Sequence, residues 1–229
     1  MFNNFWERIW QTLFDNFDFL LNALGQTLII AFWGFTIGLF IATIVAVSLT
    51  HQKPSRAIKL TNKVFDVLIW IIRGTPIVVM LLLMYFVILS QLRLDAIIIA
   101  IFAFSLYCGA YMTEILRGAI NGIDKNQFEA GRALGLSNWY IMWKIVLPQA
   151  YKNATRSLGN ISIMTVKDTS IVSFITIIDI TRATQLIIMR TYDAIAPYIL
   201  LALIYLAIVG ILTLGIKGVE KWLSFKSKI

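Results

Sequence analysis

The chain has 229 residues, of which 59% are hydrophobic and 14% charged, and its formal net charge is +8. Soluble domains are usually about 45–50% apolar and about 25% charged, so this composition and a mean hydropathy of +0.80 indicate an integral membrane protein. A single cysteine and a single histidine exclude an intrachain disulfide and a cluster with zinc-ligand spacing. The cations lie between apolar runs rather than in one patch, which argues against a nucleic acid partner.

Residues 1–19 do not have the pattern of a cleavable signal peptide, because they include acidic residues and lack a basic start followed by a short apolar run. They place apolar and aromatic side chains at helical spacing, namely Phe2, Phe5, Trp6, Ile9, Trp10, Leu13, Phe14 and Phe17. Such a face predicts a helix lying in the membrane interface. A helix packed on the protein's own surface explains the pattern equally well.

Five segments are long and apolar enough to cross the membrane: residues 20–49, 64–89, 94–116, 158–178 and 197–216. A helix needs roughly 20 mostly apolar residues to cross about 30 Å of hydrocarbon. We therefore predict one all-α transmembrane domain over residues 1–229, with the first three spans in 20–116 and the last two in 158–216. A cytoplasmic loop occupies residues 117–157, and residues 217–229 form a cytoplasmic tail.

The distribution of cations predicts the orientation of the chain. Lys and Arg gather after the first span, between the third and fourth spans, and in the C-terminal tail. The opposite side holds only Arg8, Arg93, Arg182 and Arg190. Because cytoplasmic loops carry the excess of Lys and Arg, we expect the N-terminus outside and the C-terminus in the cytoplasm of a bacterial cell membrane.

The loop between the third and fourth spans is too long for a turn and too rich in helix formers for an irregular connection. A helical run over residues 129–134 can end at Gly135 in a left-handed conformation. A second run, over residues 139–146, is predicted to stop before Pro148. Two short helices joined at a glycine would form a projection below the membrane. This projection is either a contact for a soluble partner or a connector lying on the surface.

Within this loop, Glu129-Ala130-Gly131-Arg132-Ala133-Leu134-Gly135-Leu136 is followed by Ile145 and Pro148. The stretch resembles the EAA loop of ABC importer permeases, in which Glu-Ala-Ala, a glycine and Ile-x-Leu-Pro recur at this spacing. The chain has Gly131 where alanine is usual. Since glycine costs up to about 1 kcal/mol relative to alanine in a helix, Gly131 is predicted to loosen this helix slightly.

Three further motifs narrow the resemblance to the polar amino acid permeases. They are Arg73-Gly74-Thr75-Pro76 in the second span, Tyr111-x-x-Glu114-x-x-Arg117-Gly118 in the third, and Lys167-Asp168-Thr169-Ser170 in the fourth. The resemblance implies the type I ABC importer permease fold and a pathway formed by two permease subunits, identical or different. It also implies ATP-binding cassette ATPase subunits docked on the EAA loops and an extracytoplasmic amino acid-binding protein.

The same resemblance implies roles for individual residues. ATPase coupling falls to Glu129, Ala130, Gly131, Ala133, Leu134, Gly135 and Leu136. The sequence has no G-x-x-x-x-G-K-[ST] phosphate loop, so ATP and Mg are expected on the partner ATPase. We predict a transporter subunit that is not an enzyme and binds no cofactor itself.

Charged residues inside the spans suggest where a substrate binds. Arg73 and Lys167 fall within apolar segments, where each costs about 2.5–3.5 kcal/mol at a helix centre, and Asp168 and Glu114 are the available carboxylates. A free amino acid needs a cation and an anion. The predicted substrate-binding set is Arg73, Thr75, Glu114, Lys167, Asp168, Thr169 and Ser170. The alternative is an ion-pair network that only fixes helix packing.

Local geometry adds three expectations. Lys167 and Asp168 are sequence neighbours, so their side chains point about 100° apart on a helix. Gly74 and Pro76 should weaken or kink the second span, either at a substrate site or gate or merely for packing. Gly34 and Gly38 form a G-x-x-x-G pair that allows close helix packing, within the chain or between subunits.

Other functions fit the sequence less well. A secondary transporter often contains two similar halves with paired broken helices, and no second copy of the Arg73–Pro76 element is present. A membrane enzyme needs a catalytic constellation in its spans, but the only histidine, His51, lies in a predicted loop. An importer of cystine or another small solute, or an exporter, remains an alternative within the same architecture. The identity of the transported amino acid stays open.

Overall fold

The computed structural model describes residues 2–50 and 56–225, and in this part of the chain the regular secondary structure is entirely helical. His51, Lys53, the last four residues and the side chains of Phe2 and Phe5 lie outside the description. The α-helices are α1 (Phe2–Asp15), α2 (Phe17–Leu49), α3 (Arg56–Gly74), α4 (Ile77–Leu83), α5 (Ala96–Asn121), α6 (Asn126–Ala133), α7 (Asn138–Ile141), α8 (Leu147–Asp168), α9 (Ile180–Thr191) and α10 (Ile195–Phe225). The π-helices η1 (Met84–Ile88) and η3 (Met142–Val146) and the 3₁₀-helices η2 (Ser90–Leu92) and η4 (Thr169–Ile175) complete the order.

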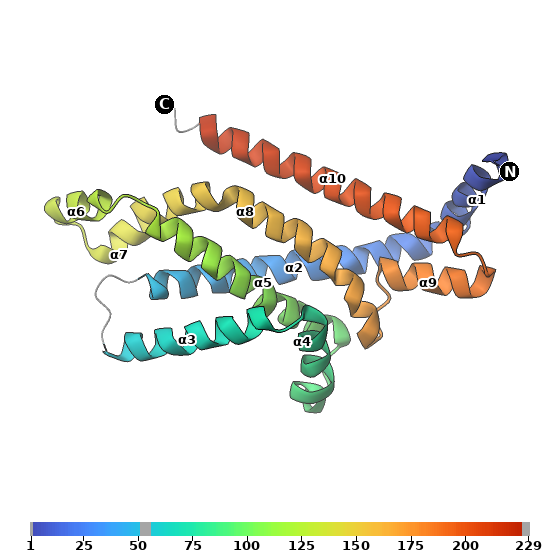
Figure 1. Ribbon diagram of the computed structural model, residues 1–229, viewed down its shortest axis with the longest axis horizontal. Helices are drawn as coiled ribbons and strands as arrows, with labels where there is room; N and C mark the ends of the chain where they lie inside the picture. The colour runs from blue at the N-terminus through green and yellow to red at the C-terminus, as the bar shows by residue number, and fades with distance from the viewer. Residues whose placement is uncertain (1, 51–55, 226–229) are drawn as a thin grey trace.

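The arrangement of long helices agrees with the predicted five spans if each of two bent helix pairs counts as one. In the described residues, α2, α5 and α10 are each long and apolar enough to cross a membrane alone. The segment Arg56–Gly74 meets Ile77–Ile88 at 109°, and Asn138–Ile175 meets Ile180–Thr191 at 54°. Figure 1 shows α1 and α9 at one end of the long axis, and α6, α7 and the end of α10 at the other.

Helices α2 and α5 cross closely at the centre of the molecule because glycines line their contact. A Cβ atom on Gly38 would lie 2.8 Å from the backbone oxygen of Ser105 and 3.1 Å from the backbone nitrogen of Gly109. A Cβ atom on Gly34 would lie 2.8 Å from the Cβ of Phe104. The predicted close packing at Gly34 and Gly38 is therefore confirmed, and it occurs within the chain.

The second span is two helices rather than one kinked helix. Helix α3 ends at Gly74, and Pro76 has extended backbone angles (φ −57°, ψ 137°) before α4 starts. Proline has no N–H to donate, and it disfavours a helical conformation for the residue before it. The predicted weakening at Gly74 and Pro76 is confirmed, but the turn of 109° is far sharper than a kink.

The fourth span also changes direction, at a position that the sequence did not predict. After α8 the chain continues as the seven-residue 3₁₀-helix η4, although 3₁₀ runs longer than three or four residues are uncommon. Thr176 then adopts the left-handed conformation (φ 73°), which is rare for a β-branched residue. Helix α9 starts a few residues later, so this break consists of strained backbone.

The prediction that a helix stops before Pro148 was wrong. The chain runs from α7 through the π-turn η3 directly into α8, and Pro148 occupies the first turn of α8. Proline is tolerated in the first turn because its missing N–H would have no helical partner there. Helix α8 therefore begins below the predicted span and joins the cytoplasmic loop to the membrane domain without a break.

Beside a small cluster of Val45, Ile69 and Ala110, three larger apolar clusters hold the described helices together. We name them by location: the α6-side core includes Met112, Leu116, Phe128, Ile141 and Ile161, and the α4-side core includes Ile30, Leu81, Phe104, Val172 and Ile175. The α1-side cluster includes Ile9, Leu20, Ile180, Ile187 and Leu200. Helix α1 buries Ile9 in this cluster and exposes Trp6, Trp10 and Phe14. One face of α1 thus packs on the protein, and its aromatic face points away from it.

Candidate functional site

Both intramembrane cations predicted from the sequence lie where a helix ends. Arg73 is in the last turn of α3, directly before the break at Gly74, and Lys167 is in the last turn of α8, directly before η4. Cations are favourable in the last turn of a helix because the unpaired carbonyl groups there carry partial negative charge. The two breaks therefore explain how apolar spans can accommodate these cations.

Arg73 contacts two residues of α5. Its Nη1 lies 3.9 Å from Oε2 of Glu114. Its Cζ lies 5.3 Å from the centroid of the Tyr111 ring, within the range of a cation–π interaction. The Tyr111 hydroxyl donates to the backbone oxygen of Arg73 at 3.4 Å. The motifs around Arg73 and Glu114, distant in sequence, thus meet in one place.

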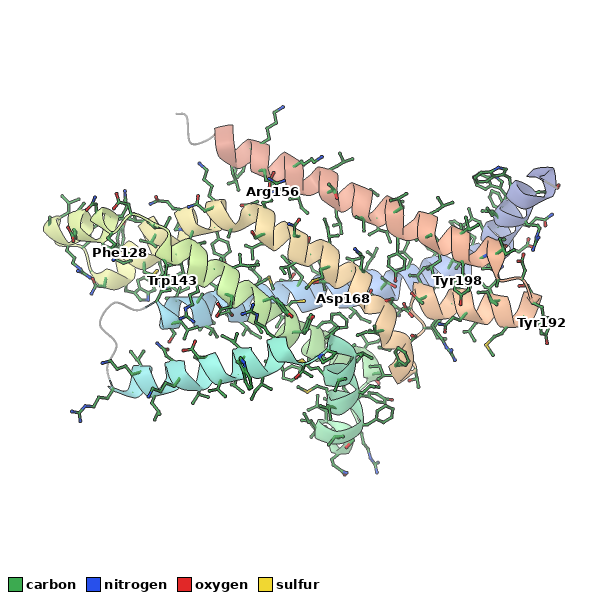
Figure 2. All side chains as sticks on the ribbon, in the orientation of Figure 1. Phe128, Trp143, Arg156, Asp168, Tyr192 and Tyr198 are labelled. Carbon is green, nitrogen blue, oxygen red and sulfur yellow. The ribbon has the colours of Figure 1, made fainter. Side chains whose placement is uncertain are left out.

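A row of polar side chains continues from Tyr111 to the end of α8. The rings of Tyr107 and Tyr111 have their centroids 5.0 Å apart. The Thr165 hydroxyl, about one turn before Asp168 on α8, lies 3.1 Å from Sγ of Cys108, the neighbour of Tyr107 on α5, and Figure 2 shows Asp168 near the middle of the molecule. We call Arg73, Glu114, Tyr111, Tyr107 and Asp168 the polar row. It joins α3, α5 and α8, and it provides a cation, two carboxylates and two aromatic hydroxyls.

The two tyrosines were not among the predicted site residues, although Tyr111 belongs to a motif noted above. A signal was present in the sequence: Tyr107, Tyr111 and Glu114 follow one another at intervals of four and three residues, which places them on one face of a helix. Only the position of α3 and α8 beside this face shows that the stripe borders charged residues.

A second ion pair joins α3 to α5 one turn further along. Nη1 of Arg117 lies 2.9 Å from Oδ1 of Asp66 and 3.5 Å from Oε1 of Glu114. These side chains and Arg73 are all between about a third and a half exposed in the single chain. Because lipid disfavours such charges, this face must contact water or another protein in the membrane.

The remaining predicted site residues are placed elsewhere. The hydroxyls of Thr75 and Thr169 donate to backbone carbonyls of the helices that precede them, Ile71 of α3 at 2.8 Å and Val166 of α8 at 2.7 Å. Lys167 and Ser170 line a groove of about 440 Å³ against Tyr205 and other residues of α10. Lys167 and Asp168 therefore face different neighbours, as their spacing predicted. Within the described part of the chain, no cluster of His, Cys, Asp and Glu could hold a metal ion.

The predicted coupling residues form a helical hairpin at the end of the molecule opposite α1. Phe128 anchors α6 in the α6-side core (Figure 2). Leu136 packs partly against the same core. Of the predicted coupling residues, Glu129, Ala130, Ala133, Leu134 and Gly135 are exposed, and Leu134 is 79% exposed. Gly135 has φ 75°, which confirms the predicted left-handed end of α6.

Gly131 has a different role from the predicted loosening of the helix. It is buried, and a Cβ atom there would lie 2.7 Å from Cδ1 and 2.7 Å from Cγ1 of Ile141. Glycine at this position lets α6 approach α7 closely enough for Ile141 to be fully buried. The departure from the usual alanine thus matches the large side chain on the facing helix.

We expect Gly131→Ala to destabilise the hairpin, because overpacking a close contact typically costs about 1–3 kcal/mol. Ile141→Ala alone should cost about 2–5 kcal/mol by leaving a cavity. In the double variant the new methyl group occupies part of that cavity, so the two losses should not add. Thermal unfolding of the four proteins in detergent measures this coupling, and strictly additive losses would contradict the proposed contact.

Comparison with known sequences shows a likeness over nearly the whole chain. The family described as binding-protein-dependent transport system inner membrane component matches residues 34–224. The probable amino-acid ABC transporter permease protein YckA of Bacillus subtilis is 33% identical over 211 residues, which cover 90% of each protein. The glutamine transport system permease protein GlnP of Escherichia coli K12 is 33% identical over 219 residues, covering 94% of this chain and 96% of GlnP.

Comparison with solved structures agrees. A crystal structure of an amino acid ABC transporter with histidines matches with a TM-score of 0.78 and 32% identity, covering 91% of this chain and 96% of that one. An inward-facing structure of the MetNI methionine ABC transporter matches with a TM-score of 0.72 over 89% of this chain and 94% of the other. At 19% identity the second likeness shows the fold alone.

Proposed function

This chain belongs to the family of binding-protein-dependent transport system inner membrane components, as a permease subunit of the polar amino acid ABC importers, and we propose that its polar row lines the path of a free amino acid. It is a multi-pass protein of the inner membrane and is not itself an enzyme. The relatives named for glutamine and amino acid transport favour an amino acid over cystine or another small solute.

The observation that carries the proposal is the pairing of Arg73 with Glu114 at the break of the second span. The two charges are 3.9 Å apart and partly exposed, so the pair can open without leaving a deeply buried charge alone. The carboxylate of an amino acid can replace Glu114 as the partner of Arg73. Its ammonium group can then pair with Glu114 or Asp168. The polar row thus offers both charges that a free amino acid requires.

The other predicted residues have lesser places in this proposal. Lys167 forms no salt bridge within the described residues, and with Ser170 it faces α10. We propose that Lys167 becomes a second cation that binds the substrate carboxylate when α10 moves relative to α8. Thr75 and Thr169 do not donate to the substrate in this proposal, because their hydroxyl protons are bonded to backbone carbonyls. They contribute by shaping the backbone at the breaks in the second and fourth spans.

Members of this family work with an ATPase and a binding protein, and we assign the contact with the ATPase to the α6–α7 hairpin. Its exposed residues include Leu134 and Trp139, which form an apolar surface on a projection. ATP and Mg are bound by the ATPase, and the α6–α7 hairpin of this chain is the part that the ATPase moves. Closure of the ATPase pair would move the hairpin, and the α6-side core would pass that motion to α5 and α8.

We further propose that the N-terminus faces the outside, that the C-terminus faces the cytoplasm, and that two permease subunits enclose the path. The excess of Lys and Arg near α6, α7 and the end of α10 supports this orientation. Helix α1 and the C-terminal end of α10 lie at opposite ends of the long axis, as expected for a chain with an odd number of spans. A second subunit would cover the partly exposed charges of the polar row.

The test is ATP-dependent uptake by liposomes that contain this chain, its ATPase and its binding protein, with a panel of labelled amino acids and cystine. Uptake of one polar amino acid supports the proposal and shows that a homodimer suffices. If the ATPase co-purifies but no amino acid enters, either a second permease subunit is required or the substrate lies outside the panel. Failure of the ATPase to bind contradicts the role of the hairpin.

The role of the polar row is tested by Glu114→Gln, with Asp66→Asn as the matched control. Both variants remove one carboxylate partner of Arg117, but only Glu114 also contacts Arg73. Hydrogen bonds to charged groups contribute about 1.5–3 kcal/mol, so Glu114→Gln should raise the KM for uptake about tenfold or more. Asp66→Asn should leave KM within about twofold. Equal effects of the two variants would mean that these charges serve packing only.

A further inference from the structure

Tyr192 stands out at the end of the molecule opposite the coupling hairpin. Its side chain is 94% exposed, and Figure 2 shows it at the tip beyond α9. Its backbone is left-handed (φ 54°, ψ 18°), a conformation that glycine or asparagine adopts with less strain. In the single chain the ring gains no burial that would offset this strain. The fold therefore displays an aromatic side chain at a position where its backbone conformation is unfavourable.

The turn that carries Tyr192 is held firmly. The Tyr192 N–H donates to the carbonyl of Ile188 at 2.8 Å and closes α9. The Ile195 N–H donates to Oδ1 of Asp193 at 3.0 Å and starts α10. Arg8 of α1 donates to Oδ2 of Asp193 through Nε at 3.1 Å, and its Nη2 forms an ion pair with the same oxygen. Tyr192 is thus a fixed projection and not the tip of a loose loop.

The ion pair with Arg8 persists at neutral pH. Partial burial alone would raise the pKa of Asp193, but the hydrogen bonds from Arg8 and from the backbone of Ile195 outweigh it and hold the pKa below the usual range. The carboxylate is therefore charged, and α1 stays attached to the turn between α9 and α10.

A polar recess of about 360 Å³ lies beside the turn. Arg8, Gln11 and Asp15 of α1 form one wall, and Thr191 and Asp193 form the other. Lipid would not favour a recess lined by charged side chains. An exposed aromatic residue next to a polar rim is, by contrast, typical of the surfaces that soluble proteins bind, where tyrosine is enriched among the few residues that dominate the binding energy.

We propose that Tyr192 and this recess form a docking surface for the extracytoplasmic binding protein, with the Tyr192 ring as the anchor. The proposal rests on the function and orientation proposed above, which place this end of the molecule outside the cell. The Tyr192 ring would enter a pocket of the binding protein, and the recess between α1 and the turn would pair with its polar groups. Because this turn joins α9 to α10, docking there would contact the connection between these two helices directly.

The experiment uses the full transporter in nanodiscs and measures ATP hydrolysis against the concentration of amino acid-loaded binding protein. Tyr192→Asn removes the ring and suits the left-handed backbone, so the fold should be retained. We expect it to raise the half-stimulating concentration at least tenfold and to leave hydrolysis without binding protein unchanged. Tyr192→Phe keeps the ring and should stay within a few-fold of the original protein.

Tyr198→Asn is the matched control, because Tyr198 is also an exposed tyrosine but lies on the side of α10, 50% exposed. It should leave the stimulation curve unchanged. A Tyr192→Asn curve that superimposes on that of the original protein overturns the proposal. Equal shifts for Tyr192→Asn and Tyr198→Asn overturn it too, because both rings would then act as lipid anchors. If the original transporter is not stimulated by any amino acid-binding protein, the proposed partner itself is wrong, which is a separate result.

Discussion

Gly38→Ala is expected to prevent the native packing of α2 against α5. The new Cβ would lie 2.8 Å from the backbone oxygen of Ser105 and 3.1 Å from the backbone nitrogen of Gly109. Backbone atoms in the middle of two long helices cannot rotate away, so the helices must separate along their whole contact. Overpacking costs about 1–3 kcal/mol even where side chains can adjust, and we expect a loss at or above the upper end of this range.

Gly25→Ala is the matched control, because Gly25 lies on the same helix and a Cβ atom there would meet nothing within 4 Å. The unfolding temperature and the yield of folded protein in detergent should be reduced for Gly38→Ala and unchanged or slightly raised for Gly25→Ala, since alanine favours a helix more than glycine does. Equal stability of the two variants would show that α2 and α5 do not cross as described.

Gly135→Val is expected to abolish transport while the ATPase subunit still binds nucleotide. Gly135 ends α6 in the left-handed conformation, where its N–H donates to the carbonyl of Arg132 at 2.9 Å and the Leu136 N–H donates to the carbonyl of Gly131 at 3.0 Å. This pair of bonds is the Schellman motif, which requires a left-handed residue. A β-branched residue there costs at least about 1–2 kcal/mol, so the turn that presents Leu134 should be lost.

Gly135→Asn separates this effect from the mere loss of a glycine, because asparagine tolerates the left-handed conformation. Uptake by liposomes should be abolished for valine and largely retained for asparagine, with the ATPase present at equal amounts in both. Normal uptake by the valine variant would contradict the role of the hairpin as a lever. Loss of uptake in both variants would point to a need for glycine itself at the contact with the ATPase.

Apolar length and helix-breaking residues act locally, so the sequence indicated the spans and two of the helix ends, whereas the early start of α8 and the separate helix α9 were not predicted. Gly74 and Pro76 indicated the break in the second span, and Gly135 indicated the end of α6. The angle of 109° was beyond prediction, because it depends on how α4 packs on α5 and η4. Pro148 was misread for a related reason: a π-turn before the proline lets the helix continue, and nothing local distinguishes this from a stop.

The charged residues of the candidate site could be predicted from the sequence, but the contacts between them could not. The cost of a charge in lipid singled out Arg73 and Lys167, and Glu114 and Asp168 were the carboxylates available to them. The contact of Arg73 with the Tyr111 ring depends on how α3 lies along α5, and the facing of Lys167 towards α10 depends on how α8 and α10 pack. The role of Gly131 was likewise hidden, because Ile141 on another helix decides it.

Two members of the polar row, Tyr107 and Asp168, lie along the chain between residues of two different apolar cores. On α5, Tyr107 falls between Phe104 of the α4-side core and Cys108 of the α6-side core. On the fourth span, Asp168 falls between Ile161 of the α6-side core and Val172 of the α4-side core. Under the proposed function, a solute held in the row would lie beside both cores, and a tilt of one core against the other would change the distance between its binding groups. The same tilt of the two cores would then determine both the size of solute that fits the row and the moment at which the solute is released.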